Sequence, residues 1–170
     1  IGNFGISQAL HVLIKAMPIV FSKIPNLNVK LYGGGFCEQS IRDLVKELGL
    51  EKSIHFFNPV PRKEIPSILS KSLVGIVSTE DNDGVRSAIP TKTFEYFACS
   101  LPVFAYGRSD ELKRIIKESE AGIYIDGNNH EEIGNSLIEL LGDEDKLKKY
   151  CLNGRKFMER KIDFSFLKEI

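Results

Sequence analysis

The order in which helical and strand patterns follow one another is the feature that most constrains the fold of this chain. Stretches with apolar residues at helical spacing alternate with short, β-branched apolar runs along most of the length. This alternation is typical of a parallel sheet covered by helices. The run Leu73–Ser78 is apolar enough for a parallel strand that is covered on both faces. The sequence therefore predicts an α/β domain with a parallel sheet and helices on both sides.

The expected elements follow from these patterns. Helices are predicted over residues 9–20, 37–48, 63–70, 91–100 and 110–118, with two charged amphipathic helices between residues 130 and 160. Pro18 is expected to kink the first helix. Strands are predicted over residues 29–32, 53–57, 73–78, 102–105 and 121–125. The irregular segment 79–90 follows a strand, where open α/β sheets place their ligands.

Length and composition favour one domain, residues 1–170, with a local binding site. The chain has 23 basic and 23 acidic residues, so no overall field attracts a polyanion and nucleic acid is not an expected partner. No apolar run is long enough to span a membrane. Cys37, Cys99 and Cys151 form no CxxC pair and are expected to be free thiols in a reducing cytoplasm. The start at Ile1, without methionine, predicts a piece of a larger protein.

Lys92 and Glu95 are the first candidates for binding chemistry. They lie three residues apart on the helix predicted at 91–100 and so share a face. The opposite face carries the predicted core stripe of Phe94, Phe97 and Ala98. A helix start with Lys92 in its first turn and Arg86 just before it suits a diphosphate, and Glu95 could accept two hydrogen bonds from a ribose diol. An exposed Lys–Glu pair without any ligand explains the same spacing.

The glycine turns allow a ligand to approach the backbone. Gly33-Gly34-Gly35 follows a strand and precedes a helix, but the GxGxxG pattern fails at Glu38 and no GK[ST] follows. A standard dinucleotide or P-loop site is therefore not predicted. Gly2 and Gly5 have the same two interpretations, ligand approach or turn geometry. The sequence contains neither a zinc spacing nor a Ser-His-Asp arrangement, and the catalytic residues stay unknown.

Residues 90–103, Pro-Thr-Lys-Thr-Phe-Glu-Tyr-Phe-Ala-Cys-Ser-Leu-Pro-Val, resemble the most recognisable segment of the family 4 (group 1) glycosyltransferases, P-S-K-x-x-E-Y-x-A-x-G-x-P-V. Matching segments occur in order at residues 2–8, 31–35, 54–57 with Val60, and 163–166. Together they cover nearly the whole chain. The resemblance implies the Rossmann-like, donor-binding C-terminal half of a GT-B enzyme, whose N-terminal acceptor domain is absent from this chain.

The resemblance also implies a role for each matching residue. Glu95 would bind the ribose hydroxyls and Lys92 and Arg86 the diphosphate, while the backbone of Val60 would lie against the base. The turn from Gly2 to Gly5 would face the phosphates or the sugar. The expected substrate-binding residues are therefore Gly2, Asn3, Gly5, Gly34, Val60, Arg86, Ser87, Lys92 and Glu95.

Three features depart from the family pattern. Ser87 stands where the family commonly has a second glutamate, which leaves the contacts to the donor sugar open. Ser100 replaces a glycine. The usual Arg/Lys pair near the first turn is absent, which puts more weight on Arg86 and Lys92.

The activity implied by the resemblance is transfer of a hexosyl or N-acetylhexosaminyl group with retention of configuration. No cofactor or metal is expected beyond the nucleotide-sugar donor, with UDP-sugars favoured over GDP-sugars. The full-length enzyme would build a bacterial surface polysaccharide, such as capsule, O-antigen of lipopolysaccharide or exopolysaccharide. The acceptor glycan or lipid-linked sugar would bind through the missing domain. The expected location is the cytoplasm, with peripheral association at the inner face of the cell membrane, and the isolated chain is expected to be inactive.

Two alternatives remain open. A stand-alone sensor of a nucleotide or phosphosugar could use the same cleft without catalysis. Asp81-Asn82-Asp83 could hold a divalent cation between its carboxylates, as the DxD signature of one glycosyltransferase class does, which would make the transferase metal-dependent. A solvated turn is the favoured interpretation of those three residues.

Overall fold

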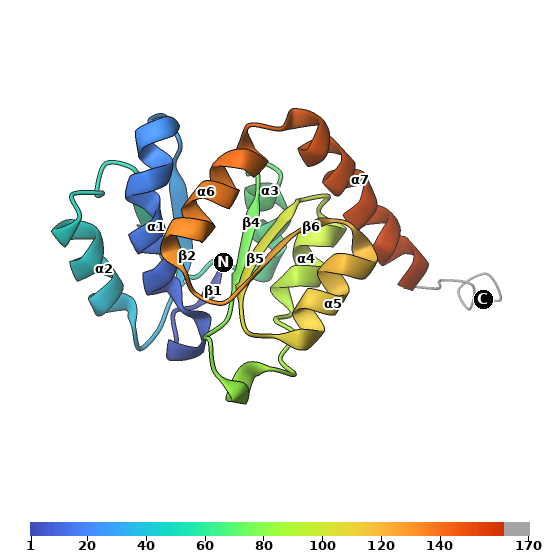
Figure 1. Ribbon diagram of the computed structural model, residues 1–170, viewed down its shortest axis with the longest axis horizontal. Coiled ribbons are helices and arrows are strands. Elements are labelled where there is room, and N and C mark those ends of the chain that lie inside the picture. The colour runs from blue at the N-terminus through green and yellow to red at the C-terminus, as the bar shows by residue number, and fades with distance from the viewer. Residues whose placement is uncertain (162–170) are drawn as a thin grey trace.

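The computed structural model describes residues 1–161 and shows parallel strands with helices on both sides, as the sequence predicts (Figure 1). The strands are β1 (Gly2–Asn3), β2 (Val29–Gly34), β3 (Ile54–Phe57), β4 (Gly75–Ser78), β5 (Val103–Gly107) and β6 (Gly122–Asp126). The helices are α1 (Leu10–Lys23), α2 (Glu38–Glu47), α3 (Ile65–Leu69), α4 (Lys92–Ala98), α5 (Asp110–Ser119), α6 (His130–Leu141) and α7 (Glu144–Lys161). Short 3₁₀ turns are η1 (Ile6–Gln8), η2 (Arg62–Glu64) and η3 (Asp83–Val85). The matching segment at residues 163–166 lies outside the described residues.

The strands of residues 1–161 form two parallel three-stranded sheets, in the orders β1-β2-β3 and β4-β5-β6. The sequence predicts a single parallel sheet, and the difference arises at β1. Only two residues of β1 pair with β2, Gly2 with Gly33 and Asn3 with Gly34. Because β1 is so short, it does not bridge the two halves.

Hydrogen bonds hold the two sheets together where β1 and β4 end. The backbone amide of Glu80, just past β4, donates to the carbonyl of Ser7 at 3.0 Å. The hydroxyl of Ser78 donates to the carbonyl of Gln8. The buried hydroxyl of Tyr106 donates to the carbonyl of Ala9 at 2.9 Å. The turn after β1 is thereby fixed against the carboxyl ends of β4 and β5.

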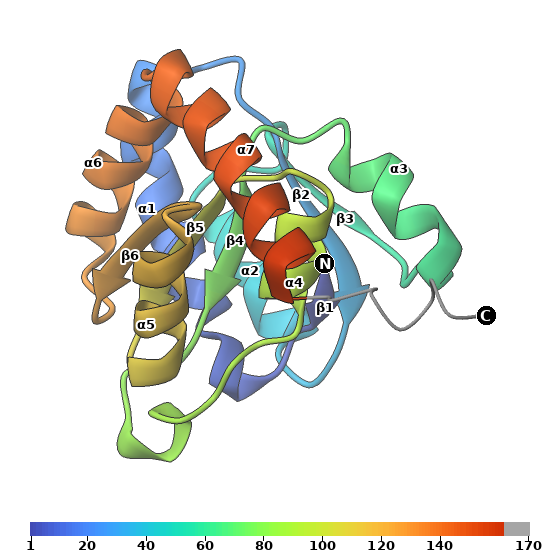
Figure 2. The same cartoon turned by 90° about the vertical axis from the view of Figure 1, so that its right-hand side faces the viewer.

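Apolar clusters cover both faces of the strands. Buried side chains of α1, α2 and α6 pack on one face, and those of α4, α5 and α7 pack on the other (Figure 2). Phe97 of α4 is fully buried and meets Phe157 of α7 edge to face, with ring centroids 5.8 Å apart. No helix within residues 1–161 is long and apolar enough to cross a membrane.

The buried face of α4 differs from the predicted one. Its buried residues are Thr93, Tyr96 and Phe97, whereas Phe94 and Ala98 are only partly buried. Phe97 confirms the predicted stripe, and Phe94, although only partly buried, packs against the same apolar cluster. α4 packs against α7 as well as against the sheet. Gly154 of α7 permits this approach, since a Cβ there would lie 3.3 Å from the Cα of Phe97. Leu73 was also misassigned, because it precedes β4 and is exposed.

Candidate functional site

The carboxyl ends of the parallel strands all face one edge of the fold. At this edge the chain leaves β1 into the turn at residues 4–8 and leaves β4 into the loop at residues 79–90, and the two segments touch through the Glu80–Ser7 hydrogen bond. Strands β2 and β3 follow β1 toward one side of the fold, and β5 and β6 follow β4 toward the other, so the strand order reverses between β1 and β4. Open α/β sheets bind their ligands in the crevice at such a point. This part of the edge, between the turn after β1 and the loops after β3 and β4, is therefore the candidate site and is called the crevice below.

The glycines at the end of β2 are explained mainly by strand packing. Gly33 has φ +142°, and a Cβ there would lie 1.8 Å from the carbonyl oxygen of Gly2. Gly35 has φ +150°, and its Cβ would lie 2.2 Å from the side-chain oxygen of Asn3. Gly34 is different, since its Cβ would meet only the carboxylate of Glu38, at 3.1 Å. Of the three, Gly34 is the one that close packing does not require.

β1 presents exposed residues where it ends at the crevice. Gly2 and Asn3 are exposed, and a Cβ on Gly2 would meet nothing within 4 Å. The amide of Gly5 donates to the side-chain oxygen of Gln8 at 3.0 Å. That amide is thus already engaged within the turn, and the open positions are Gly2 and Asn3.

Glu95 and the loop after β3 come together across the crevice. The guanidinium of Arg62, in η2, lies 3.4 Å from a carboxylate oxygen of Glu95, whose side chain is 34% exposed. Val60 lies two residues before Arg62 and is partly buried. Sequence reasoning missed Arg62, which is 33 residues from Glu95. The only signal for it was its place after the carboxyl end of a predicted strand.

Arg86 is tied to the start of α5. Its guanidinium lies 2.9 Å from Asp110 and 3.6 Å from Asp83, and its carbonyl accepts a hydrogen bond from the amide of Asp110 at 2.8 Å. The hydrogen bond with Asp110 raises the pKa of Arg86. The adjoining Ser87 is exposed. The predicted diphosphate pair of Arg86 and Lys92 is thus not assembled around a common partner.

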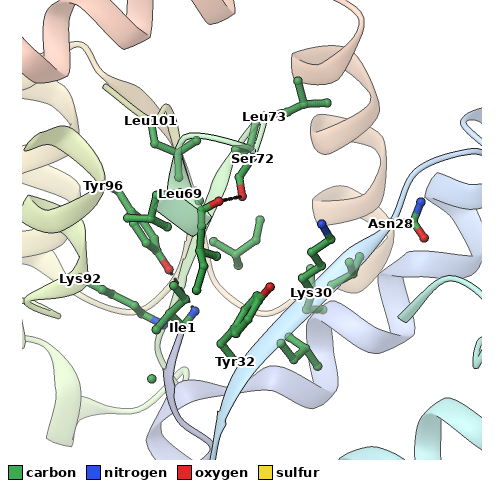
Figure 3. A pocket seen from close by; sticks show the side chains of 18 of the residues that line it. Ile1, Asn28, Lys30, Tyr32, Leu69, Ser72, Leu73, Lys92, Tyr96 and Leu101 are labelled. Carbon is green, nitrogen blue, oxygen red and sulfur yellow. Dashed lines mark hydrogen bonds between the residues drawn. The ribbon is translucent and has the colours of Figure 1, made fainter. Parts of the chain in front are cut away.

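Lys92 points into a groove beneath the crevice instead of outward with Glu95. In Figure 3 its side chain runs from α4 toward Ile1 and lies beside Tyr96, one helical turn further along. It is partly buried, and burial lowers the pKa of its ammonium group to about 8. Within residues 1–161 no carboxylate is paired with it. An anion that reached this group would find an unpaired, partly desolvated cation.

Lys92→Met is expected to stabilise the chain at pH 7, and the gain should shrink as the pH rises toward 9.5. The unfolded chain keeps its Lys92 proton up to a pKa near 10.5, whereas the folded chain loses it near 8. The unfolded state therefore binds more protons in this window, and the stability of the parent rises with pH there. Urea unfolding of both proteins at pH 7 and 9.5 measures the difference. The exposed Lys52→Met is the control, and an equal pH response in that variant would refute the burial argument.

Asp81 and Asp83 are each paired with an arginine. Asp81 lies 3.5 Å from Arg108, and Asp83 lies 3.6 Å from Arg86. In the described part of the chain, no group of three or more His, Cys, Asp or Glu side chains is arranged to hold a metal ion. The geometry favours an ion-paired loop over a cation site at these two residues.

Comparison with known sequences agrees with the predicted family. A family model described as "Glycosyl transferases group 1" matches residues 1–157. The D-inositol 3-phosphate glycosyltransferase of Corynebacterium glutamicum is 30% identical over 152 residues, which cover 85% of this chain and 35% of that protein. An uncharacterized glycosyltransferase of Haemophilus influenzae is 26% identical over 143 residues, covering 84% of this chain and 38% of that protein. The chain thus spans little more than a third of the length of these two relatives.

Solved structures share the fold. The C-terminal domain of the group 1 glycosyl transferase LpcC from Francisella tularensis superposes with a TM-score of 0.79 at 20% identity, over 96% of this chain and 84% of that one. Anabaena HepE, crystallised in complex with UDP, gives a TM-score of 0.77 at 17% identity, over 99% of this chain and 46% of that one. These likenesses confirm the Rossmann-like fold of a GT-B C-terminal half. With the family model matching nearly its whole length, this chain belongs to the group 1 glycosyltransferases.

Proposed function

We propose that this chain is the donor-binding domain of a retaining glycosyltransferase and that its crevice holds a nucleoside diphosphate sugar. The observation that carries the proposal is the meeting of Glu95 with the loop of Val60 and Arg62 at the carboxyl edge of the strands. A carboxylate with one oxygen toward Arg62 keeps acceptor capacity for a ribose diol. The exposed Gly2–Asn3 backbone lies at the same edge and suits the phosphates or the sugar.

UDP-sugars are the proposed donors. HepE, whose fold this chain shares, was crystallised with UDP-glucose. The transferred group would be hexosyl or N-acetylhexosaminyl. Isothermal titration of the chain with UDP, UDP-glucose, GDP and GDP-mannose tests the proposal directly. Saturable binding of a uridine compound supports it, and binding of none of the four would remove it.

The intact enzyme would use a separate N-terminal domain for its acceptor. We place its product among bacterial surface polysaccharides, because WaaG, a structural neighbour with a TM-score of 0.77 at 16% identity, is involved in lipopolysaccharide biosynthesis. A lipid-linked acceptor would bring the enzyme to the inner face of the cell membrane as a peripheral protein.

The isolated chain is expected to bind nucleotide but to transfer no sugar. A second domain has to close over the donor to exclude water and to bring the acceptor to it. Incubation with UDP-glucose and a mixture of glycan acceptors, followed by mass spectrometry, measures transfer. Sustained product formation by these residues alone would contradict the two-domain proposal.

A further inference from the structure

Residues 107–110, between β5 and α5, hold the loop at residues 79–90 in two places. At the start of the loop, the amide of Arg108 donates to the hydroxyl oxygen of Thr79 at 3.1 Å and to the carbonyl of Glu80 at 3.3 Å. Near its end, the amide of Asp110 donates to the carbonyl of Arg86 at 2.8 Å. Both Figure 1 and Figure 2 show the loop passing beside α5. The loop is therefore fixed on each side of η3.

Ser109 lies at the centre of the second attachment. It is 1% exposed, and its hydroxyl donates to the carbonyl of Ala88 at 2.6 Å while it accepts from the amide of Leu112 at 3.0 Å. The amide of Ser109 donates to the hydroxyl oxygen of Tyr124, in β6, at 2.7 Å. One buried serine thus joins the loop to the first turn of α5 and to β6.

The hydroxyl of Tyr124 continues this set of hydrogen bonds. It donates to the carbonyl of Gly107, at the end of β5, at 2.9 Å. Burial raises the pKa of Tyr124, so its hydroxyl stays protonated at neutral pH and remains a donor. Hydrogen bonds in such a chain polarise and strengthen one another where water is excluded. The position of Ala88 is therefore tied, through Ser109 and Tyr124, to the sheet of β4, β5 and β6.

The attachment fixes a segment in which substrate-binding residues are predicted. The carbonyl of Arg86 is held by the amide of Asp110, and the carbonyl of Ala88 is held by the hydroxyl of Ser109. Ser87, between these two carbonyls, is exposed. Because the backbone is held on both sides of Ser87, a ligand of this segment does not have to order it on binding.

The same attachment reaches the start of α4. Ala88 lies two residues before Pro90, whose carbonyl accepts from the amide of Thr93, in the first turn of α4, at 3.0 Å. Glu95 follows two residues later in the same helix. A displacement of Ala88 would therefore strain the start of the helix that carries Glu95.

We propose that Ser109 and Tyr124 are positioning residues for the donor, because together they hold residues 86–88 in the arrangement that the donor meets. Ser109 acts through Ala88, since it is too deeply buried to touch a ligand, and Tyr124 acts through Ser109. Where the hold is lost, some molecules leave this arrangement, and the apparent Kd rises by the inverse of the fraction that keeps it. The inference rests on the proposed function, since it concerns the same crevice.

The opposite end of α5 offers a matched control. Ser119 is 3% exposed, and its hydroxyl donates to the carbonyl of Ile116 at 3.2 Å and accepts from the amide of Ala121 at 3.3 Å. Neither of these partners belongs to the loop at residues 79–90. Ser109→Ala and Ser119→Ala each remove one buried hydroxyl with two hydrogen bonds, so the pair separates a general loss of stability from a loss of position.

Ser109→Ala should weaken the binding of UDP by about 10-fold at a temperature at which all variants are folded, because the carbonyl of Ala88 loses its partner. Amide hydrogen exchange at Arg86 and Ala88 should be about 10-fold faster than in the parent. Ser119→Ala should also lower the free energy of unfolding, but it should keep the UDP affinity and the loop exchange of the parent. Titration calorimetry, exchange followed by NMR and urea unfolding measure the three quantities.

Tyr124→Phe is the second variant, and it keeps the ring while removing only the hydroxyl. It should weaken UDP binding by about 3-fold or more and speed up exchange at Ala88. Tyr150→Phe, at a partly buried tyrosine of α7, should do neither. Because this change is nearly isosteric, it decides the question where Ser109→Ala does not fold.

Unchanged UDP affinity in the folded variants of Ser109 and Tyr124 would overturn the inference. An equal loss of affinity in Ser119→Ala would also overturn it, because the effect would then be one of stability alone. If the parent chain binds no UDP, the proposed function fails instead. Loop exchange then decides alone, and unchanged exchange at Arg86 and Ala88 overturns the hold of Ser109 on the loop.

Discussion

Glu95→Gln is expected to weaken the binding of UDP to this chain by about 1.5–3 kcal/mol, which is about 10- to 150-fold in Kd. The carboxylate lies in the crevice with one oxygen near Arg62 and its side chain 34% exposed, so it is accessible to a ligand. A ribose diol can donate two hydrogen bonds to a charged carboxylate, whereas an amide offers one neutral oxygen. Titration calorimetry of both proteins at the same salt concentration measures the loss.

The fold should survive this change. Arg62 is 89% exposed, and an exposed pair contributes well under about 1 kcal/mol to stability. Glu64→Gln removes an exposed carboxylate in η2, the same turn as Arg62; it is the matched control and should bind UDP like the parent. If Glu95→Gln also binds UDP like the parent, Glu95 is a surface ion-pair residue and the assignment of the ribose site to it is lost.

The order of helices and strands was predictable because each element here carries a local signal. The helix starting at Asp110 has a serine at its N-cap, and the hydroxyl of Ser109 accepts from the amide of Leu112 at 3.0 Å. Gly49 follows α2 with φ +67°, a conformation that glycine adopts readily at a helix end. Such signals lie within a few residues of one another, so a single sequence contains them.

The site was less predictable because its contacts join distant parts of the chain. The family motif points to the segment of Lys92 and Glu95, but helical spacing could not show that Lys92 turns into the groove beside Tyr96. The partner of Arg86 is Asp110, 24 residues further on. No periodicity connects such pairs, since the packing of α4 and α5 on the sheet decides them.

Gly33→Ala is expected to destabilise the chain by about 3 kcal/mol or more, and its neighbour Gly34→Ala by less than about 1 kcal/mol. At Gly33 the backbone has φ +142°, and a Cβ would lie 1.8 Å from the carbonyl oxygen of Gly2. The atom in the way is backbone, so β1 itself would have to move. At Gly34 the added Cβ would meet only the end of the Glu38 side chain, which can rotate away.

Urea unfolding measures the free energy of unfolding of each variant, and the two values compare directly when both depend on urea concentration with the same slope. The displacement of β1 in the Gly33→Ala variant would also disturb the Gly2–Asn3 backbone at the crevice, because Gly2 pairs with Gly33 and Asn3 with Gly34. Under the proposed function, Gly33→Ala should therefore bind UDP more weakly even in conditions where it is fully folded, whereas Gly34→Ala should keep its affinity unless the ligand approaches that residue. Equal free energies of unfolding for the two variants would show that β1 yields freely, and the contact between β1 and β2 could not then be what positions the turn at the site.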